Sequence, residues 1–150
     1  MAENKIDLNK TIDAGAKTME LTDGKGHSVE IEFNPYDTML IGAILDATEK
    51  LDAIQAKLAP LSMENWREYY TAAMEADKEM RVILDGIFDK PICEALFPRQ
   101  TVFAIANGFP AWANLLCAVL EVMDAGLATE KKNAQNRIRK YSGKYKKGKK

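Results

Sequence analysis

The chain has 150 residues, 47% of them hydrophobic and 29% charged, with a formal net charge of −1. These values are ordinary for one soluble globular domain. The N-terminal stretch MAENKIDLNK has no apolar segment behind its lysines, so we expect it not to be a secretory signal. Two distant cysteines and one histidine are too few ligands for a zinc site, and cysteines in apolar surroundings suit a reducing cytoplasm.

Alternating residues predict a β-hairpin near the N-terminus. Met19 and Leu21 alternate with polar residues in a first run, and Val29, Ile31 and Phe33 do so in a second. The sequence Asp-Gly-Lys-Gly between the runs supplies glycines for a tight turn. The hairpin has one apolar face and one acidic face. Because an isolated hairpin is marginally stable in water, we expect the apolar face to pack on other elements.

Two amphipathic helices are predicted to follow the hairpin. Asp37 is a suitable N-cap for the first helix, whose apolar residues recur every three or four positions over residues 40–58. Ser62 is a suitable N-cap for the second helix, and Leu61 and Trp66 then occupy hydrophobic-staple positions. The apolar residues of the second helix show the same spacing: Tyr69, Ala73, Ala76, Met80, Ile83 and Ile87.

The next part of the chain is predicted to be helical with interruptions. Pro91 and Pro98 flank a short apolar turn, and a helix or helix pair is expected from about Thr101 to Leu127, broken near Gly108. This break also argues against a membrane span in the uncharged stretch. We expect an α+β, mainly α fold in which an N-terminal β-hairpin packs on a small helical bundle. The expected divisions are a loose arm at 1–16, one domain at 17–130 and a flexible basic tail at 131–150.

No catalytic constellation can be recognised in the sequence. The single histidine, His27, follows the predicted hairpin turn, so a Ser-His-acid or Cys-His arrangement would lack a suitable imidazole. The glycines of the turn match neither phosphate-binding pattern, GxxxxGK[ST] or GxGxxG. The carboxylates of the two long helices fall on their polar sides. The sequence therefore predicts a protein that is not an enzyme and that uses no cofactor or metal.

The C-terminal end has a strong positive charge. Ten of the 21 Lys and Arg residues, and none of the 22 Asp and Glu residues, lie between Lys131 and Lys150. Cations interleaved with Tyr141 and Tyr145 suit a nucleic acid, although the acidic body argues against this. Opposite charge along one chain also suits a protein partner or self-association, and a flexible solubilising end is a third reading. The basic residues singled out are Lys131, Lys132, Arg137, Arg139, Lys140, Lys144, Lys146 and Lys147.

Over about residues 18–145 the layout resembles the tail assembly chaperones of long-tailed bacteriophages. The resemblance rests on the hairpin MELTDGKGHSVEIEFNPYD before amphipathic helices, on LDGIFDKPICEALF, and on the end RKYSGKYKK. Similar sequences often carry Phe-Gly and a small Gly-Thr-Cys-like turn in the second stretch. Here Phe88 matches, residues 89–92 replace the glycine-rich part, and residues 93–97 resume the pattern.

The resemblance implies a non-enzymatic role in the host cytoplasm. Such chaperones coat the tape measure protein, keep it soluble, help to recruit tail tube protein, commonly oligomerise and are absent from the mature virion. A largely helical tape measure protein offers apolar stripes that helix-in-groove contacts can cover. The rival function is a small nucleic-acid-binding or regulatory protein that uses residues 131–150. Candidate contact residues, each with a core position as the alternative, are Trp66, Phe97, Phe103, Phe109 and Trp112.

Overall fold

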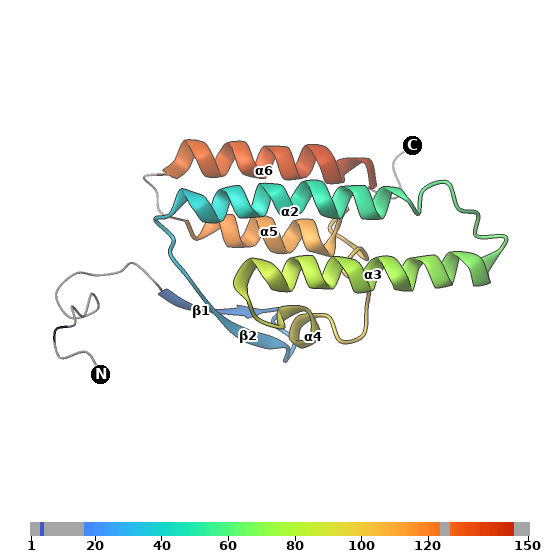
Figure 1. Ribbon diagram of the computed structural model, residues 1–150, viewed down its shortest axis with the longest axis horizontal. Coiled ribbons are helices and arrows are strands. Elements are labelled where there is room, and N and C mark those ends of the chain that lie inside the picture. Colours follow the sequence, from blue (N-terminus) through green and yellow to red (C-terminus); the bar gives the residue numbers. More distant parts are fainter. Residues whose placement is uncertain (1–3, 5–16, 124–126, 146–150) are drawn as a thin grey trace.

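The computed structural model describes residue 4, residues 17–123 and residues 127–145. It confirms the predicted fold class, because an N-terminal antiparallel hairpin packs on a mainly helical body (Figure 1). The arm predicted at 1–16 lies outside the described residues except for Asn4, and the last five residues lie outside them too. None of the helices in the described ranges is both long enough and apolar enough to cross a membrane.

The predicted hairpin consists of β1 (Lys17–Thr22) and β2 (Ser28–Phe33), with Met19 opposite Ile31 and Leu21 opposite Val29. Its turn needs glycine at two positions, since Gly24 and Gly26 have φ angles of 75° and 99°. The apolar face turns inward and buries Ile31. The acidic face remains exposed, so the hairpin covers one side of the core as expected.

Helix α2 (Thr38–Ala56) begins and packs as predicted. The Asp37 side chain accepts a hydrogen bond from the Met39 amide at 2.9 Å and caps the helix. The buried stripe of α2 includes Ile44 and Leu51, which are completely inaccessible to solvent. Helix α2 contacts α3, α5 and α6, so its stripe forms the centre of the bundle.

Helix α3 (Trp66–Phe88) begins later than the sequence predicts. Its N-cap is Asn65, whose side-chain oxygen accepts from the Glu68 amide, whereas Ser62 accepts from Glu64 in a turn before the helix. Because Trp66 is the first helical residue, it does not occupy the staple position. Local hydrogen bonding by serine competes with capping here, which the residue type does not reveal.

The helix predicted from Thr101 begins only after an irregular segment. Short α4 (Ile92–Leu96) leads into a loop and then into a second small hairpin, β3 (Ile105–Ala106) and β4 (Phe109–Pro110), with α5 (Ala111–Glu121) following. Asn107 and Gly108 form its turn with positive φ angles of 56° and 85°. The predicted break near Gly108 is therefore a hairpin turn.

The predicted flexible tail is wrong for the described part of residues 131–150. Residues Ala128–Ser142 form helix α6, and Gly143–Tyr145 form a 3-10 turn, η2. Ala134, Ile138 and Ser142 are buried at four-residue spacing against α2 and α5. This buried stripe is only three small or medium side chains long and includes one polar residue, and the surrounding cations obscured it in the sequence.

The helices form a layered bundle that encloses the C-terminal part of α3 and leaves its N-terminal end exposed. Helix α6 lies on one side of α2 and α5, and the hairpin and α4 lie on the other side (Figure 1). The N-terminal end of α3 extends along the long axis of the molecule beyond α5 and α6 (Figure 1). The core therefore covers the C-terminal part of α3 more completely than its first two turns.

Candidate partner-binding site

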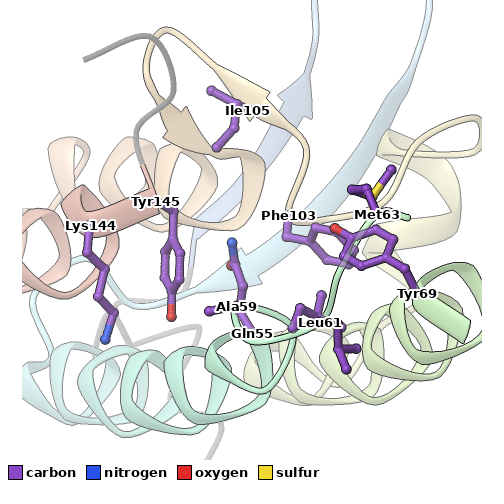
Figure 2. Close-up of a pocket in the computed structure, with 10 residues that line it drawn as sticks. Gln55, Ala59, Leu61, Met63, Tyr69, Phe103, Ile105, Lys144 and Tyr145 are labelled. Carbon is purple, nitrogen blue, oxygen red and sulfur yellow. The ribbon is translucent and has the colours of Figure 1, made fainter. Parts of the chain in front are cut away.

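A groove of about 510 Å³ opens at the end of the bundle where α2 leads into α3 (Figure 2). We call it the bundle-end groove. Figure 2 shows Tyr69 from α3 next to Phe103, and Ile105 from β3 at another part of the lining. Most of its lining is apolar, and the α2–α3 connection contributes Leu58, Leu61 and Met63.

A small hydrophobic cluster behind the groove fixes its position. Leu58, Ala73 and Ala76 are buried together, and Leu61, Tyr69 and Phe103 pack against them. Leu58 lies just after the end of α2, where the backbone continues through turn hydrogen bonds to Leu61. The connection between the two helices is therefore part of the packed structure and forms a defined wall of the groove.

A partly buried ion pair holds the opposite wall. The Asp77 carboxylate accepts hydrogen bonds from Arg81 Nε at 2.7 Å and from the Val102 amide at 2.8 Å. Arg81 Nη2 also donates to the carbonyl oxygens of Phe97 and Gln100, each at 2.7 Å. These bonds join α3 to an irregular loop and so position the Phe103 side chain that follows it.

The polar side of the groove is formed by the C-terminal turn packed on α2. Tyr145 Oη donates to an Asp52 carboxylate oxygen at 2.7 Å, and Lys144 Nζ lies 3.0 Å from the same carboxylate. Burial, and then the hydrogen bond to Asp52, raise the pKa of Tyr145 above its usual value of 10.0. These contacts hold η2 against the last turns of α2 and close one side of the groove.

The Tyr145 contact predicts a specific loss of stability at alkaline pH. Tyr145→Phe should lower the free energy of unfolding by about 1 kcal/mol at neutral pH. A raised folded-state pKa means that the tyrosine contributes fully below pH 10.0 and loses its contribution as the pH rises further. The difference between the native protein and the variant, measured by urea denaturation, should therefore shrink above about pH 10.

The native protein and the Tyr145→Phe variant both contain Cys93 and Cys117, whose pKa values are raised by burial. Titration of these two thiols therefore cancels in the comparison. A difference in stability that stays constant from neutral to strongly alkaline pH would contradict the role assigned to the Tyr145 hydroxyl.

An exposed aromatic strip adjoins the groove on the first turns of α3. Trp66, Tyr70, Ala73 and Asp77 follow one another at spacings of four, three and four, which places them on one side of the helix. Ala73 and Asp77 are buried, but Trp66 and Tyr70 are 56% and 58% exposed. The core-facing side of α3 thus continues past the end of the bundle. Nearby Met63 lines the groove and is also exposed.

The structure separates the aromatic residues predicted as contacts. Phe103 lies in the bundle-end groove, and Trp66 lies in the exposed strip beside it. Phe97 lines a different hollow near the turn of the first hairpin, and Phe109 lies under the Arg139 guanidinium at 4.1 Å. Trp112 is completely buried, so its prediction as a partner contact is wrong.

Several predicted tail cations are used within the molecule. Lys131 Nζ donates to the carbonyl oxygens of Glu121 and Met123 at the end of α5, where cations are favourable. Arg139 contacts Phe109, and Lys144 pairs with Asp52. Three residues of the set are exposed on α6: Lys132, Arg137 and Lys140. The Arg137 guanidinium is 3.7 Å from the Glu49 carboxylate. Lys146 and Lys147 lie outside the described residues.

Other chemistry would require metal ligands or reactive side chains. The described residues contain no group of three or more His, Cys, Asp and Glu side chains able to hold a metal ion. The hydrogen bond from the His27 ring lowers the pKa of Asp23 to about 2, and it joins two residues of the hairpin turn. Burial raises the pKa of the Cys93 thiol, which disfavours the nucleophilic thiolate.

Known proteins give no further guidance. No protein-family model, curated protein or solved structure matches this chain. The site is therefore assigned from its own geometry.

Sequence reasoning missed several residues of this site, among them Gln55, Met63, Tyr70 and Tyr145. Trp66 precedes Tyr69 and Ala73 of the predicted stripe by three and seven residues, and this spacing could have revealed that the stripe continues to Trp66. Nothing comparable marks Tyr145, because its contact with α2 joins segments that are far apart in the sequence.

Proposed function

We propose that this chain is a tail assembly chaperone of a long-tailed bacteriophage. It binds the tape measure protein in the host cytoplasm, keeps it soluble and helps to recruit tail tube subunits without making or breaking a covalent bond. It self-associates along the tape measure protein and is absent from the mature virion. This proposal unites the resemblance of the sequence with the surface at the end of the bundle.

The observation that carries the proposal is the continuation of the core-facing side of α3 beyond the core. Inside the bundle this side packs on other helices, and at its N-terminal end it presents Trp66 and Tyr70 to solvent. Aromatic residues beside an apolar groove are typical of binding sites for amphipathic helices. A helix of the tape measure protein would cover the strip in the way that α2 covers the rest of α3.

A second observation supports the family assignment. Asp89 ends α3 with φ 53° and ψ 46°, a left-handed conformation that favours glycine. It follows Phe88 at the place where similar sequences carry glycine. A glycine at this place would adopt the same left-handed conformation without strain, and aspartate is among the residues that tolerate it.

The proposal predicts a loss of binding from Trp66→Ala. An aromatic anchor of an interface contributes about 2 kcal/mol or more, so the affinity for the tape measure protein should fall at least about thirtyfold. The two proteins of the same phage would be co-expressed, the soluble fraction of the tape measure protein measured, and the affinity determined by calorimetry. The exposed position of Trp66 leaves the stability of the variant nearly unchanged.

Val82→Ala is the matched control, because Val82 is 69% exposed on the same helix but distant from the strip. The Val82→Ala variant should bind the tape measure protein with the affinity of the native protein. A native protein that leaves the tape measure protein insoluble would refute the function, and a Trp66→Ala variant with native affinity would refute the site.

A further inference from the structure

Gln55 is a buried polar residue at the base of the bundle-end groove. It lies in the last turn of α2 and is only 7% exposed. Its Oε1 atom accepts a hydrogen bond of 2.7 Å from the indole Nε1 of the completely buried Trp112. Since an indole nitrogen only donates, this bond fixes which end of the Gln55 amide faces Trp112.

The amide nitrogen of Gln55 consequently faces the groove. Figure 2 shows it between the rings of Tyr145 and Phe103. Nε2 donates to no residue within the described ranges. Because every fully buried side-chain nitrogen or oxygen in those ranges has a partner, Nε2 cannot be one of the fully buried atoms. The Nε2 atom is therefore reached through the groove. A donor is held in a fixed orientation within a mostly apolar site.

Two other polar groups of the groove, those of Tyr145 and Lys144, are already paired with Asp52. The hydroxyl proton of Tyr145 is donated to Asp52, and the ammonium group of Lys144 lies 3.0 Å from the same carboxylate. The positive charge at this wall is thereby neutralised. A carboxylate entering the groove would lose its hydration without meeting a free cation, whereas an uncharged acceptor needs only the Gln55 donor.

We propose that Gln55 selects the segment that the groove binds. The ligand is an amphipathic helix of the partner protein whose apolar stripe carries one uncharged acceptor side chain, such as asparagine, which accepts from Gln55 Nε2. The helical form follows from the α3 strip that continues beside the groove. The identity of the partner rests on the proposed function, but the selection of an acceptor follows from the geometry of Gln55 and Trp112.

The experiment uses designed peptides that contain no tape measure sequence. Each is an amphipathic helix of about 20 residues with a leucine stripe. One asparagine is moved through the stripe positions in turn. Affinities for the native protein and for Gln55→Met are measured by fluorescence anisotropy. At the best position, the preference for asparagine over leucine should be about tenfold greater in the native protein than in the variant.

A second measurement avoids any effect of the substitution on folding. In the native protein, the side-chain amide resonances of Gln55 should shift when the asparagine peptide binds and stay nearly unchanged with the leucine peptide. Equal preferences in the two proteins, unmoved resonances, or no binding of any peptide to the native protein would each overturn the inference. Binding of these peptides together with no effect on the tape measure protein would refute the proposed function alone.

Discussion

Asp77→Ala should lower the free energy of unfolding by about 3 kcal/mol, because it removes a buried carboxylate that accepts hydrogen bonds from both Arg81 and the Val102 amide. The Asp77 side chain is 9% exposed and accepts from both Arg81 and the Val102 amide. Its loss leaves a partly buried guanidinium and a buried amide without their acceptor. Urea denaturation followed by circular dichroism measures the change.

Two further substitutions serve as comparisons for Asp77→Ala. Asp77→Asn retains an acceptor oxygen for Val102 but removes the charge opposite Arg81, so it should cost roughly half as much. Glu79→Ala, at an exposed position of the same helix, should change the stability by less than about 0.5 kcal/mol. If Asp77→Ala were no more destabilising than Glu79→Ala, the ion pair would not be what holds the loop.

The Asp77 substitution also connects stability with the site. The loop held by Arg81 leads directly to Phe103, one wall of the bundle-end groove. We therefore expect Asp77→Ala to weaken peptide binding even under conditions in which the variant is fully folded. This effect acts through the position of the wall, since Asp77 does not line the groove.

Trp112→Ala should be the most destabilising single substitution considered, with a loss of about 4 kcal/mol. The side chain is completely buried in the main core, and its Nε1 atom bonds to Gln55. Truncation leaves a large cavity and removes the only donor to Gln55 Oε1 within the described residues. Trp112→Phe should cost about half as much because most of the volume is retained.

The second tryptophan provides the matched comparison. Trp66→Ala should change stability by less than about 0.5 kcal/mol, since the Trp66 side chain is 56% exposed. The fluorescence of the single-tryptophan variants gives an independent test: emission from Trp112 in Trp66→Phe should be blue-shifted, and emission from Trp66 in Trp112→Phe should resemble that of tryptophan in water. Equal stability losses from the two alanine variants would show that Trp112 does not anchor the core.

The different environments of the two tryptophans illustrate the limits of residue type as a guide. Both were equally good candidates for a partner contact, because a large aromatic residue is suited to a core and to an interface alike. Trp66 is the first residue of a helix that extends past its neighbours, and Trp112 lies in the first turn of a helix that is enclosed by them. Their burial depends on where the helices end in space.

Local patterns of the sequence were sufficient for the hairpin and the long helices. Alternation at period two identified β1, β2 and their apolar face, the two turn glycines have positive φ, and Asp37 caps α2 as predicted. These features depend on neighbours within a few residues, so the chain specifies them without reference to the rest of the fold.

Helix α6 and the groove depended on contacts between distant segments. A strongly basic sequence forms a packed helix because Ala134 and Ile138 find an apolar surface on α2 and α5, and because Lys131 caps the end of α5. The Gln55 donor exists as a site feature only because Trp112, 57 positions away, binds the other end of its amide. Burial and hydrogen bonding between such segments are set by the assembled fold, and for this reason local spacing could not predict them.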